Sequence, residues 1–132
     1  LMQLFPNLKY NILGISNELP KWNYNFYNEL AKCKMSLNLS RGKPLKYTSS
    51  NRIAALVGNG IFTFIDINTK FNDFFDDNEV GFYKNVKDLG NKIEYLLKYP
   101  KKINEYGKRG KEKYFKLFNN KIITKKIIEK TF

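Results

Sequence analysis

The chain contains no histidine and a single cysteine, Cys33, among its 132 residues. One cysteine excludes an internal disulfide and fits a reducing compartment. Without histidine, the common zinc sites are excluded, and so are Ser-His-Asp and Cys-His nucleophilic machinery. Any chemistry must therefore rely on carboxylates, hydroxyls, basic side chains or backbone amides.

Long apolar runs are also absent. No stretch approaches the roughly 20 apolar residues that a membrane-spanning helix needs. The first residues, Leu1 to Phe5, lack the charged start and small-residue cleavage site of a signal peptide. These absences predict a cytoplasmic location. The chain begins with Leu rather than Met, which we interpret as the sign of a longer protein.

Acidic residues are few: 12 face 24 basic ones, which gives a net charge of +12. Such a charge favours a polyanionic partner, namely nucleic acid, anionic lipid or a phosphorylated ligand. Lys greatly outnumbers Arg, although bidentate recognition of phosphates or bases favours Arg. An AT-rich coding sequence explains much of this bias, and no RNP, zinc-finger or KH signature is present. Nucleic acid is therefore a disfavoured partner.

What the sequence does contain is 42% hydrophobic and 16% aromatic residues, enough for a folded core. Hydrophobic periodicity and turn residues divide it into alternating elements. We predict strands over 9–15, 35–39, 61–67 and 79–83, helices over 22–34, 51–57, 86–99, 101–110 and 111–130, and a helical turn over 71–75. One face of the helix over 86–99 carries Leu89, Ile93, Leu96 and Leu97.

Strands that alternate with helices predict an α/β fold, a Rossmann-like parallel sheet flanked by helices. We expect one domain over residues 1–132. Four strands are fewer than a complete doubly wound domain has, so we expect the first part of the sheet to lie upstream.

The segment from Ser40 to Arg52 (SRGKPLKYTSSNR) is the strongest candidate site. It leaves the strand over 35–39 at the carboxyl edge, where open α/β sheets bind ligands, and enters the helix over 51–57. Unpaired N–H groups at a helix start favour anions. The side chains that would hold a pyrophosphate are those of Arg41, Lys43, Lys46, Ser49, Ser50 and Arg52. The alternative is an ordinary N-capped helix after a basic loop.

Two other clusters are weaker candidates. The Gly58-Asn59-Gly60 turn has the composition of a helix C-cap. The acidic residues Asp73, Asp76, Asp77 and Glu79 offer ligands for Mg²⁺, but they surround a short turn that predicts a solvated loop, and we expect no metal site.

The two helices predicted over 101–132 are strongly basic. Their apolar stripe consists of Tyr114, Phe115, Phe118, Ile122, Ile123, Ile127 and Ile128. Such a stripe either packs on its own protein or lies on an anionic membrane surface. Peripheral contact with the inner face of the membrane therefore stays open.

From about Trp22 to its end, the chain resembles bacterial group-1-type glycosyltransferases, most of all the CgeB-like branch. The resemblance rests on ordered segments: LNLSRG, YTSSNRIAALVGNG, IFTFID, FNDFFDDNEVGFYKN and DLGNKIEYLLKYPKKINEYGKRGKEKY. It implies the C-terminal half of a two-Rossmann (GT-B) fold, which binds a nucleoside-diphosphate sugar as its donor. No cofactor and no metal held by a DxD motif are implied.

In that family an R-x-x-E-x-x-x-x-G pattern faces the donor. Arg52 and Gly60 match its first and last positions, whereas the acidic position, which bonds ribose hydroxyls in related transferases, falls on Ala55. The resemblance and the residue pattern agree on one segment. The predicted diphosphate ligands are Arg41, Lys43, Ser49, Ser50 and Arg52, and the predicted donor-site loop adds Gly42, Tyr47, Asn51 and Gly60.

The resemblance implies a hexosyltransferase-type glycosyltransferase that acts on a cell-envelope glycan or glycolipid. An N-terminal domain outside this chain would bind the acceptor and supply the base, so we expect the isolated chain to be inactive. Two alternatives remain: a basic nucleic-acid-binding module, and a non-catalytic Rossmann-like interaction domain, which Ala55 favours.

Overall fold

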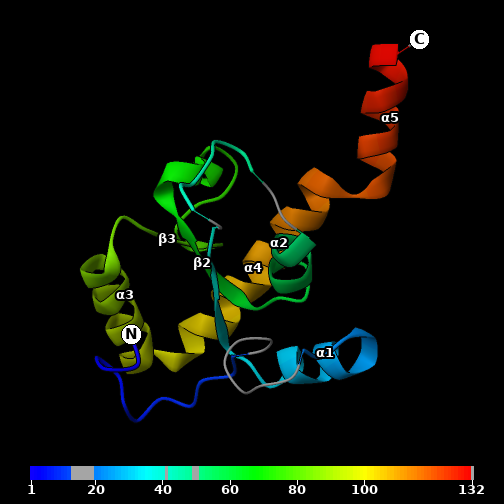
Figure 1. The fold of residues 1–132 in the computed structure, drawn as a ribbon. Coiled ribbons are helices and arrows are strands. Elements are labelled where there is room, and N and C mark those ends of the chain that lie inside the picture. Colours follow the sequence, from blue (N-terminus) through cyan, green and yellow to red (C-terminus); the bar gives the residue numbers. More distant parts are fainter. Residues whose placement is uncertain (13–19, 41, 49–50, 132) are drawn as a thin grey trace.

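A three-stranded parallel sheet in the order β1-β2-β3 forms the centre of the molecule (Figure 1). The computed structural model describes residues 1–12, 20–40, 42–48 and 51–131. The strands are β1 (Met35–Asn38), β2 (Phe62–Asp66) and β3 (Gly81–Tyr83). The helices are α1 (Asn23–Ala31), α2 (Asn51–Val57), α3 (Val86–Lys98), α4 (Pro100–Phe118) and α5 (Asn120–Thr131), with 3-10 turns at Ile67–Thr69 and Phe71–Asp73. This open α/β sheet flanked by helices confirms the predicted fold class.

The central strand, β2, is buried on both faces because its side chains alternate between two apolar clusters. Ile65 packs with Ile53 and Val57 of α2 on one face. Phe62 and Phe64 pack on the other face, in a cluster that includes α3 and the start of α4. The sequence of a strand that is covered on both faces is a nearly continuous apolar run. For that reason the predicted range of 61–67 lies close to the observed strand, Phe62–Asp66.

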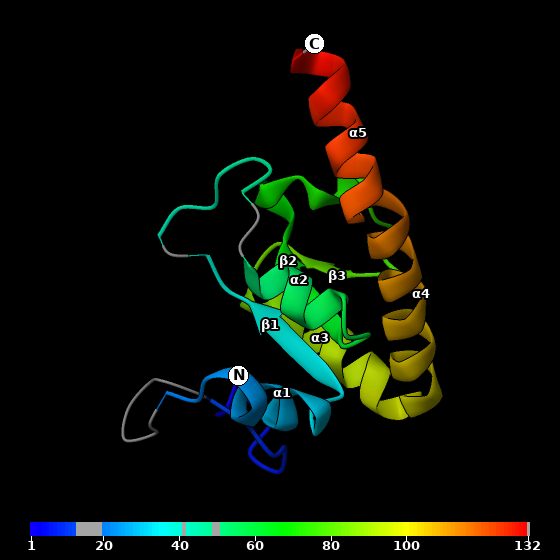
Figure 2. The same ribbon diagram turned by 90° about the vertical axis from the view of Figure 1, so that its right-hand side faces the viewer.

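Helix α4 crosses the amino ends of β2 and β3, and two glycines allow this close approach. A Cβ atom at Gly107 would lie 2.2 Å from the carbonyl oxygen of Gly60, and one at Gly110 would lie 2.3 Å from that of Glu79. Figure 2 shows α4 along one side of the sheet and the loop after β1 on the opposite side. The two ends of the strands are therefore covered by different parts of the chain.

The prediction that a helix ends near Gly110 is wrong. Helix α4 continues to Phe118, because Gly110 is a packing contact in the middle of the helix. The break lies at Asn119, whose backbone is extended and whose Oδ1 accepts a hydrogen bond from the N–H of Ile122, 2.9 Å away. Asn119 thereby caps the start of α5.

The predicted strand over 9–15 is not observed in its described part, residues 9–12. This segment is held by side chains instead: the Tyr10 hydroxyl donates to the carbonyls of Leu1 and Phe5, and the Asn11 amide donates to Glu29. The described part of the chain thus has three strands rather than four. Leu97 also departs from the predicted face of α3, since it is 39% exposed while Leu89, Ile93 and Leu96 are buried.

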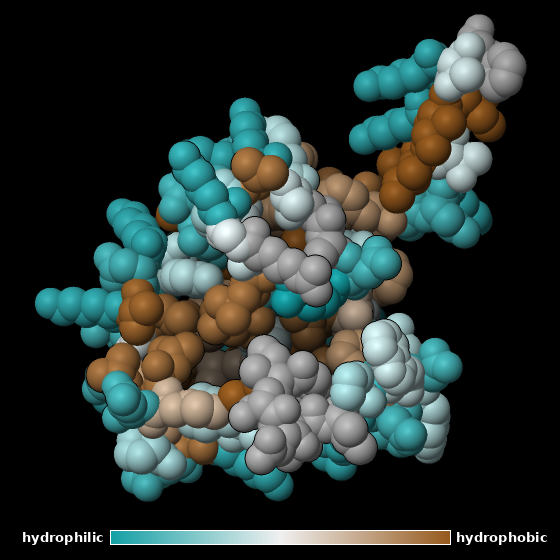
Figure 3. All heavy atoms as spheres, in the orientation of Figure 1, coloured by the Kyte–Doolittle hydropathy of each residue, from teal (hydrophilic) through white to brown (hydrophobic). Residues whose placement is uncertain are grey.

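Helix α5 projects away from the sheet, and none of its residues is buried (Figure 1). Figure 3 shows an apolar stripe along α5, with hydrophilic side chains beside it. Three isoleucines, Ile123, Ile127 and Ile128, are 42%, 59% and 52% exposed. Among the described helices, none is long and apolar enough to span a bilayer.

Candidate functional site

Each of the three parallel strands ends in a polar residue at the same edge of the sheet. β1 ends at Asn38, β2 at Asp66 and β3 at Tyr83, and in the register Asn38 pairs with Ile65 and Asp66 with Tyr83. The carboxyl edge of an open α/β sheet is where such folds bind ligands. This edge is therefore the candidate site.

Asn38 is the most unusual of these residues, because its side chain is buried and incompletely bonded. The residue is 7% exposed, and its Oδ1 has no hydrogen-bond partner among the described residues. Leaving a buried acceptor unsatisfied costs about 1–3 kcal/mol. Buried polar atoms of this kind are rare and call for a partner such as water or a bound ligand.

Arg52, the second residue of α2, lies beside the end of β1. Its Nη2 donates a hydrogen bond to the carbonyl oxygen of Leu39, 2.7 Å away, which ties the start of α2 to the residue that follows β1. The side chain is exposed. A guanidinium has five N–H donors, so this single bond leaves donors for an anion at the carboxyl edge.

The loop over 42–48 is fastened to the segment that follows β2. The N–H of Tyr47 donates to the carbonyl of Thr69, and its hydroxyl donates to Oδ2 of Asp73 at 2.6 Å. The Tyr47 ring also packs edge-on against Phe74. Both Gly42 and Tyr47 have positive φ angles, 72° and 57°, which lets the loop turn sharply. Tyr47 therefore anchors the loop.

One cation of this loop, Lys46, lies beside the Tyr47 anchor. Lys46 places its Nζ 4.6 Å from the centre of the Tyr47 ring, and Lys43 is exposed. Asn51, the first residue of α2, is exposed as well. α2 has seven residues, and the exposed cations of this part of the chain are Lys43, Lys46 and Arg52.

Asp66 and Tyr83 complete the polar edge. Oδ1 of Asp66 accepts hydrogen bonds from the backbone and side-chain nitrogens of Asn68, at 2.8 and 2.9 Å. Burial raises the pKa of the Tyr83 hydroxyl, and the negative charge of Asp66 raises it further. Tyr83 consequently stays protonated at neutral pH and can donate a hydrogen bond.

Sequence reasoning missed Asn38, Asp66 and Tyr83 as site residues. The sequence feature that could have identified them is a polar residue at or near the carboxyl end of each of the predicted strands over 35–39, 61–67 and 79–83. Because the predicted strands ran past Asn38 to Leu39 and past Asp66 to Ile67, both residues seemed internal. Only the observed strand ends bring the three side chains to one edge.

Several of the predicted site residues are not brought together. Gly60 lies at the amino end of β2, where its positive φ of 79° makes the turn under α4, away from the carboxyl edge. Ala55 packs beside Leu56 in the cluster that faces α1. Arg41, Ser49 and Ser50 lie outside the described residues.

The acidic cluster is distributed over separate contacts. Asp73 accepts from Tyr47, Glu79 accepts from the N–H of Asp76, and Asp77 pairs with Lys92 at 3.8 Å. Within the described ranges, no group of three or more His, Cys, Asp or Glu side chains is arranged to hold a metal ion.

Comparison with known proteins adds one finding. The profile of a family described as "Glycosyl transferase-like" matches residues 1–129. No significant match was found among curated proteins or among solved structures. The match spans nearly the whole chain, and the parallel α/β sheet flanked by helices is consistent with it. The chain therefore belongs to the glycosyl transferase-like family.

Proposed function

We propose that this chain is the donor-binding half of a GT-B glycosyltransferase and binds a nucleoside-diphosphate sugar at the carboxyl edge of its sheet. Membership of a glycosyl transferase-like family supports transfer of a sugar in general. The observation that carries the location is the combination of Arg52 with the buried, incompletely bonded Asn38 at the end of β1.

The diphosphate is assigned to the basic side chains at this edge. The Arg52 guanidinium matches the geometry of a phosphate, and Lys43 and Lys46 add charge from the anchored loop. When the bond from sugar to phosphate breaks, negative charge grows on the departing diphosphate. Donors that are already in position stabilise that charge without reorganisation, which is a large source of catalysis.

Asn38 is assigned to a hydroxyl of the donor. In this chain Ala55 occupies the position where related transferases carry the acidic ribose ligand, so the ribose needs another acceptor. The Oδ1 of Asn38 is an acceptor without a partner among the described residues. A hydroxyl bonded there would remove the cost of burying that atom unsatisfied.

Calorimetric titration with UDP and GDP tests this function. We expect saturable binding of one of them, weakened at least about tenfold in Arg52→Ala, because a charged hydrogen bond contributes about 1.5–3 kcal/mol. The matched control is Arg109→Ala, which removes an arginine from α4 that pairs with Glu105. It should bind within twofold of the wild type.

Two results would contradict the proposal. A twofold or smaller loss in Arg52→Ala would remove Arg52 from the site. Binding of short single-stranded DNA, with no response to UDP or GDP, would favour the nucleic-acid-binding alternative.

A further inference from the structure

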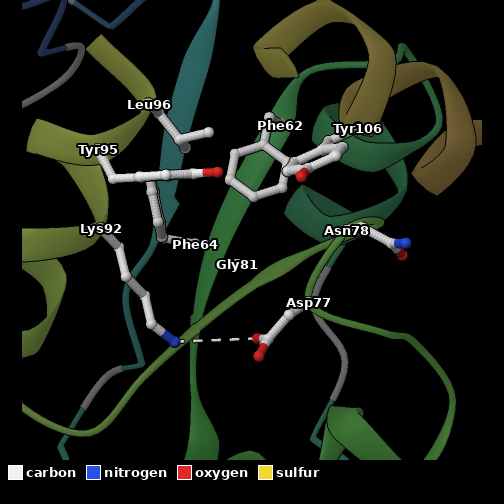
Figure 4. Close-up of a pocket in the computed structure, with 9 residues that line it drawn as sticks. All are labelled: Phe62, Phe64, Asp77, Asn78, Gly81, Lys92, Tyr95, Leu96 and Tyr106. Carbon is white, nitrogen blue, oxygen red and sulfur yellow. Dashed lines mark ion pairs between the residues drawn. The ribbon is translucent and has the colours of Figure 1, made fainter. Parts of the chain in front are cut away.

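A cavity of about 230 Å³ lies over the sheet, with lining residues from β2, β3, α3 and α4 (Figure 4). Its floor contains Phe62 and Gly81, the first residues of β2 and β3. Helix α3 forms one wall with Tyr95, and α4 contributes Tyr106. The cavity therefore extends from the amino end of β2 to the level of Phe64, and its lining does not include Asn38, Arg52, Asp66 or Tyr83.

Aromatic rings line much of the cavity. Tyr95 packs against the ring of Tyr99 at 5.0 Å and against the ammonium of Lys102, yet the residue is 44% exposed, which leaves part of its surface to a ligand. Tyr106 leans against Phe62 with ring centres 5.8 Å apart, and Phe62 packs edge-on against Phe64 at 5.2 Å. A Cβ at Gly81 would lie 2.5 Å from the Phe64 ring, so only glycine at this position leaves room for the ring as it is placed.

The polar groups at the rim balance one another in charge. Asp77 directs its carboxylate towards Lys92, whose Nζ lies 3.8 Å away and also donates to the carbonyl of Phe82 (Figure 4). The charges of these two lining residues therefore cancel, while Lys102, which does not line the cavity, donates a hydrogen bond to the hydroxyl of Tyr95 from outside. A neutral ligand with several hydroxyl groups would find both acceptors and donors here.

We propose that this cavity is a carbohydrate-binding site for one neutral hexose ring, separate from the donor site. A pyranose has an apolar face of C–H groups, which suits the rings of Tyr95 and Tyr106, and an edge of hydroxyls, which suits Asp77 and Lys92. Apolar walls with a few fixed polar groups are the usual composition of a small-ligand site. In a protein that transfers sugars, such a site would hold a glycan chain away from the point of transfer.

Titration of the 132-residue chain with methyl glycosides of glucose, galactose and N-acetylglucosamine, followed by NMR, tests the proposal. We expect saturable binding of at least one, with a Kd on the order of 1 mM, because a single ring in a half-open cavity offers few contacts. Tyr95→Ala should weaken it at least about tenfold through loss of the aromatic wall. Asp77→Ala should weaken it about fivefold through loss of a hydrogen bond.

The matched control is Tyr24→Ala in α1, which removes a tyrosine that is 77% exposed and does not line the cavity. Its affinity should stay within twofold of the wild type. Failure of all three glycosides to saturate the folded wild-type chain would overturn the proposal, and so would unchanged affinity in both Tyr95→Ala and Asp77→Ala.

The experiment also separates this site from the proposed donor site. With saturating UDP or GDP present, glycoside affinity should not change, because the two proposed sites share no residue. Competition between nucleotide and glycoside would move the sugar to the carboxyl edge and overturn the proposal. A chain that binds glycosides but no nucleotide would retain this site and lose the donor function.

Discussion

Single glycines decide how closely the elements of this chain approach one another. Gly107→Ala would push a methyl group into the Gly60 carbonyl, 2.2 Å away, so α4 would have to move off the sheet. We expect a loss of about 1–3 kcal/mol in the free energy of unfolding, measured by urea denaturation. Equal stability of the variant and the wild type would contradict this packing.

Gly90→Ala in α3 is the matched control. Its Cβ would meet Leu4 and Phe5 at 3.8 and 3.9 Å, which is ordinary contact. Alanine is the better helix former, so this variant should gain up to about 1 kcal/mol. Helix propensity favours alanine at both positions, so a loss at Gly107 beside a gain at Gly90 would have to come from the close neighbours of Gly107.

Glu29 of α1 accepts hydrogen bonds from Asn11 and Lys21 in the preceding segment and from Lys32, which directly follows the helix. Hydrogen bonds from Lys32 and then Lys21 are the main reasons that the pKa of its carboxyl falls to about 2. Because the folded pKa is the lower one, the stabilisation is present above the unfolded value, about 4.3, and is lost as the pH falls towards 2.

Glu29→Gln should consequently reduce the pH dependence of unfolding between about pH 5 and pH 2. Thermal melts of both proteins across that range provide the measurement. If the variant lost stability as steeply as the wild type, other carboxylates would have to be responsible.

At the scale of elements, α5 exposes an apolar stripe. Its three exposed isoleucines lie along a helix that also carries Lys121, Lys125, Lys126 and Lys130. We propose that this stripe contacts an anionic membrane surface, because basic amphipathic helices combine apolar insertion with attraction to anionic lipid.

Cosedimentation with phosphatidylserine vesicles would test this contact. The wild type should sediment with these vesicles and not with neutral phosphatidylcholine, and Ile127→Ser combined with Ile128→Ser should lower the partition coefficient about tenfold. Thr131→Ser is a mild control at an exposed position of α5. Sedimentation of wild type and double variant to the same extent would contradict a role for the isoleucines.

At the scale of the whole molecule, donor binding and sugar transfer can be measured separately. The proposed enzyme needs an acceptor-binding domain in addition to the carboxyl edge described here. We expect this chain alone to bind a nucleoside diphosphate and yet transfer no sugar from UDP-glucose or GDP-mannose to an added glycan. Release of labelled product by the isolated chain would show that one domain is sufficient.

The secondary structure of some segments could be predicted from the sequence and that of others could not. Helix α3 was predicted well because Leu89, Ile93 and Leu96 repeat at helical spacing and Pro100 follows its end. Residues 9–12 were predicted wrongly because a short apolar run is compatible with a strand, whereas the hydrogen bonds of Tyr10 and Asn11 that hold the segment are not visible in such a run.

The sequence by itself determined the order and type of most elements, since these depend on local periodicity and on glycine and proline at their ends. Only the tertiary structure decided which ends meet. Arg52 and Gly60 lie eight positions apart in one pattern, yet α2 carries the chain back across the sheet, so they stand at opposite ends of the strands. For the same reason Asn38, Asp66 and Tyr83, distant in sequence, share one edge. Packing of α4 against the sheet brings Tyr106 beside Phe62 and forms one wall of the cavity. Local sequence patterns could not predict this cavity, because its lining residues come from separate elements.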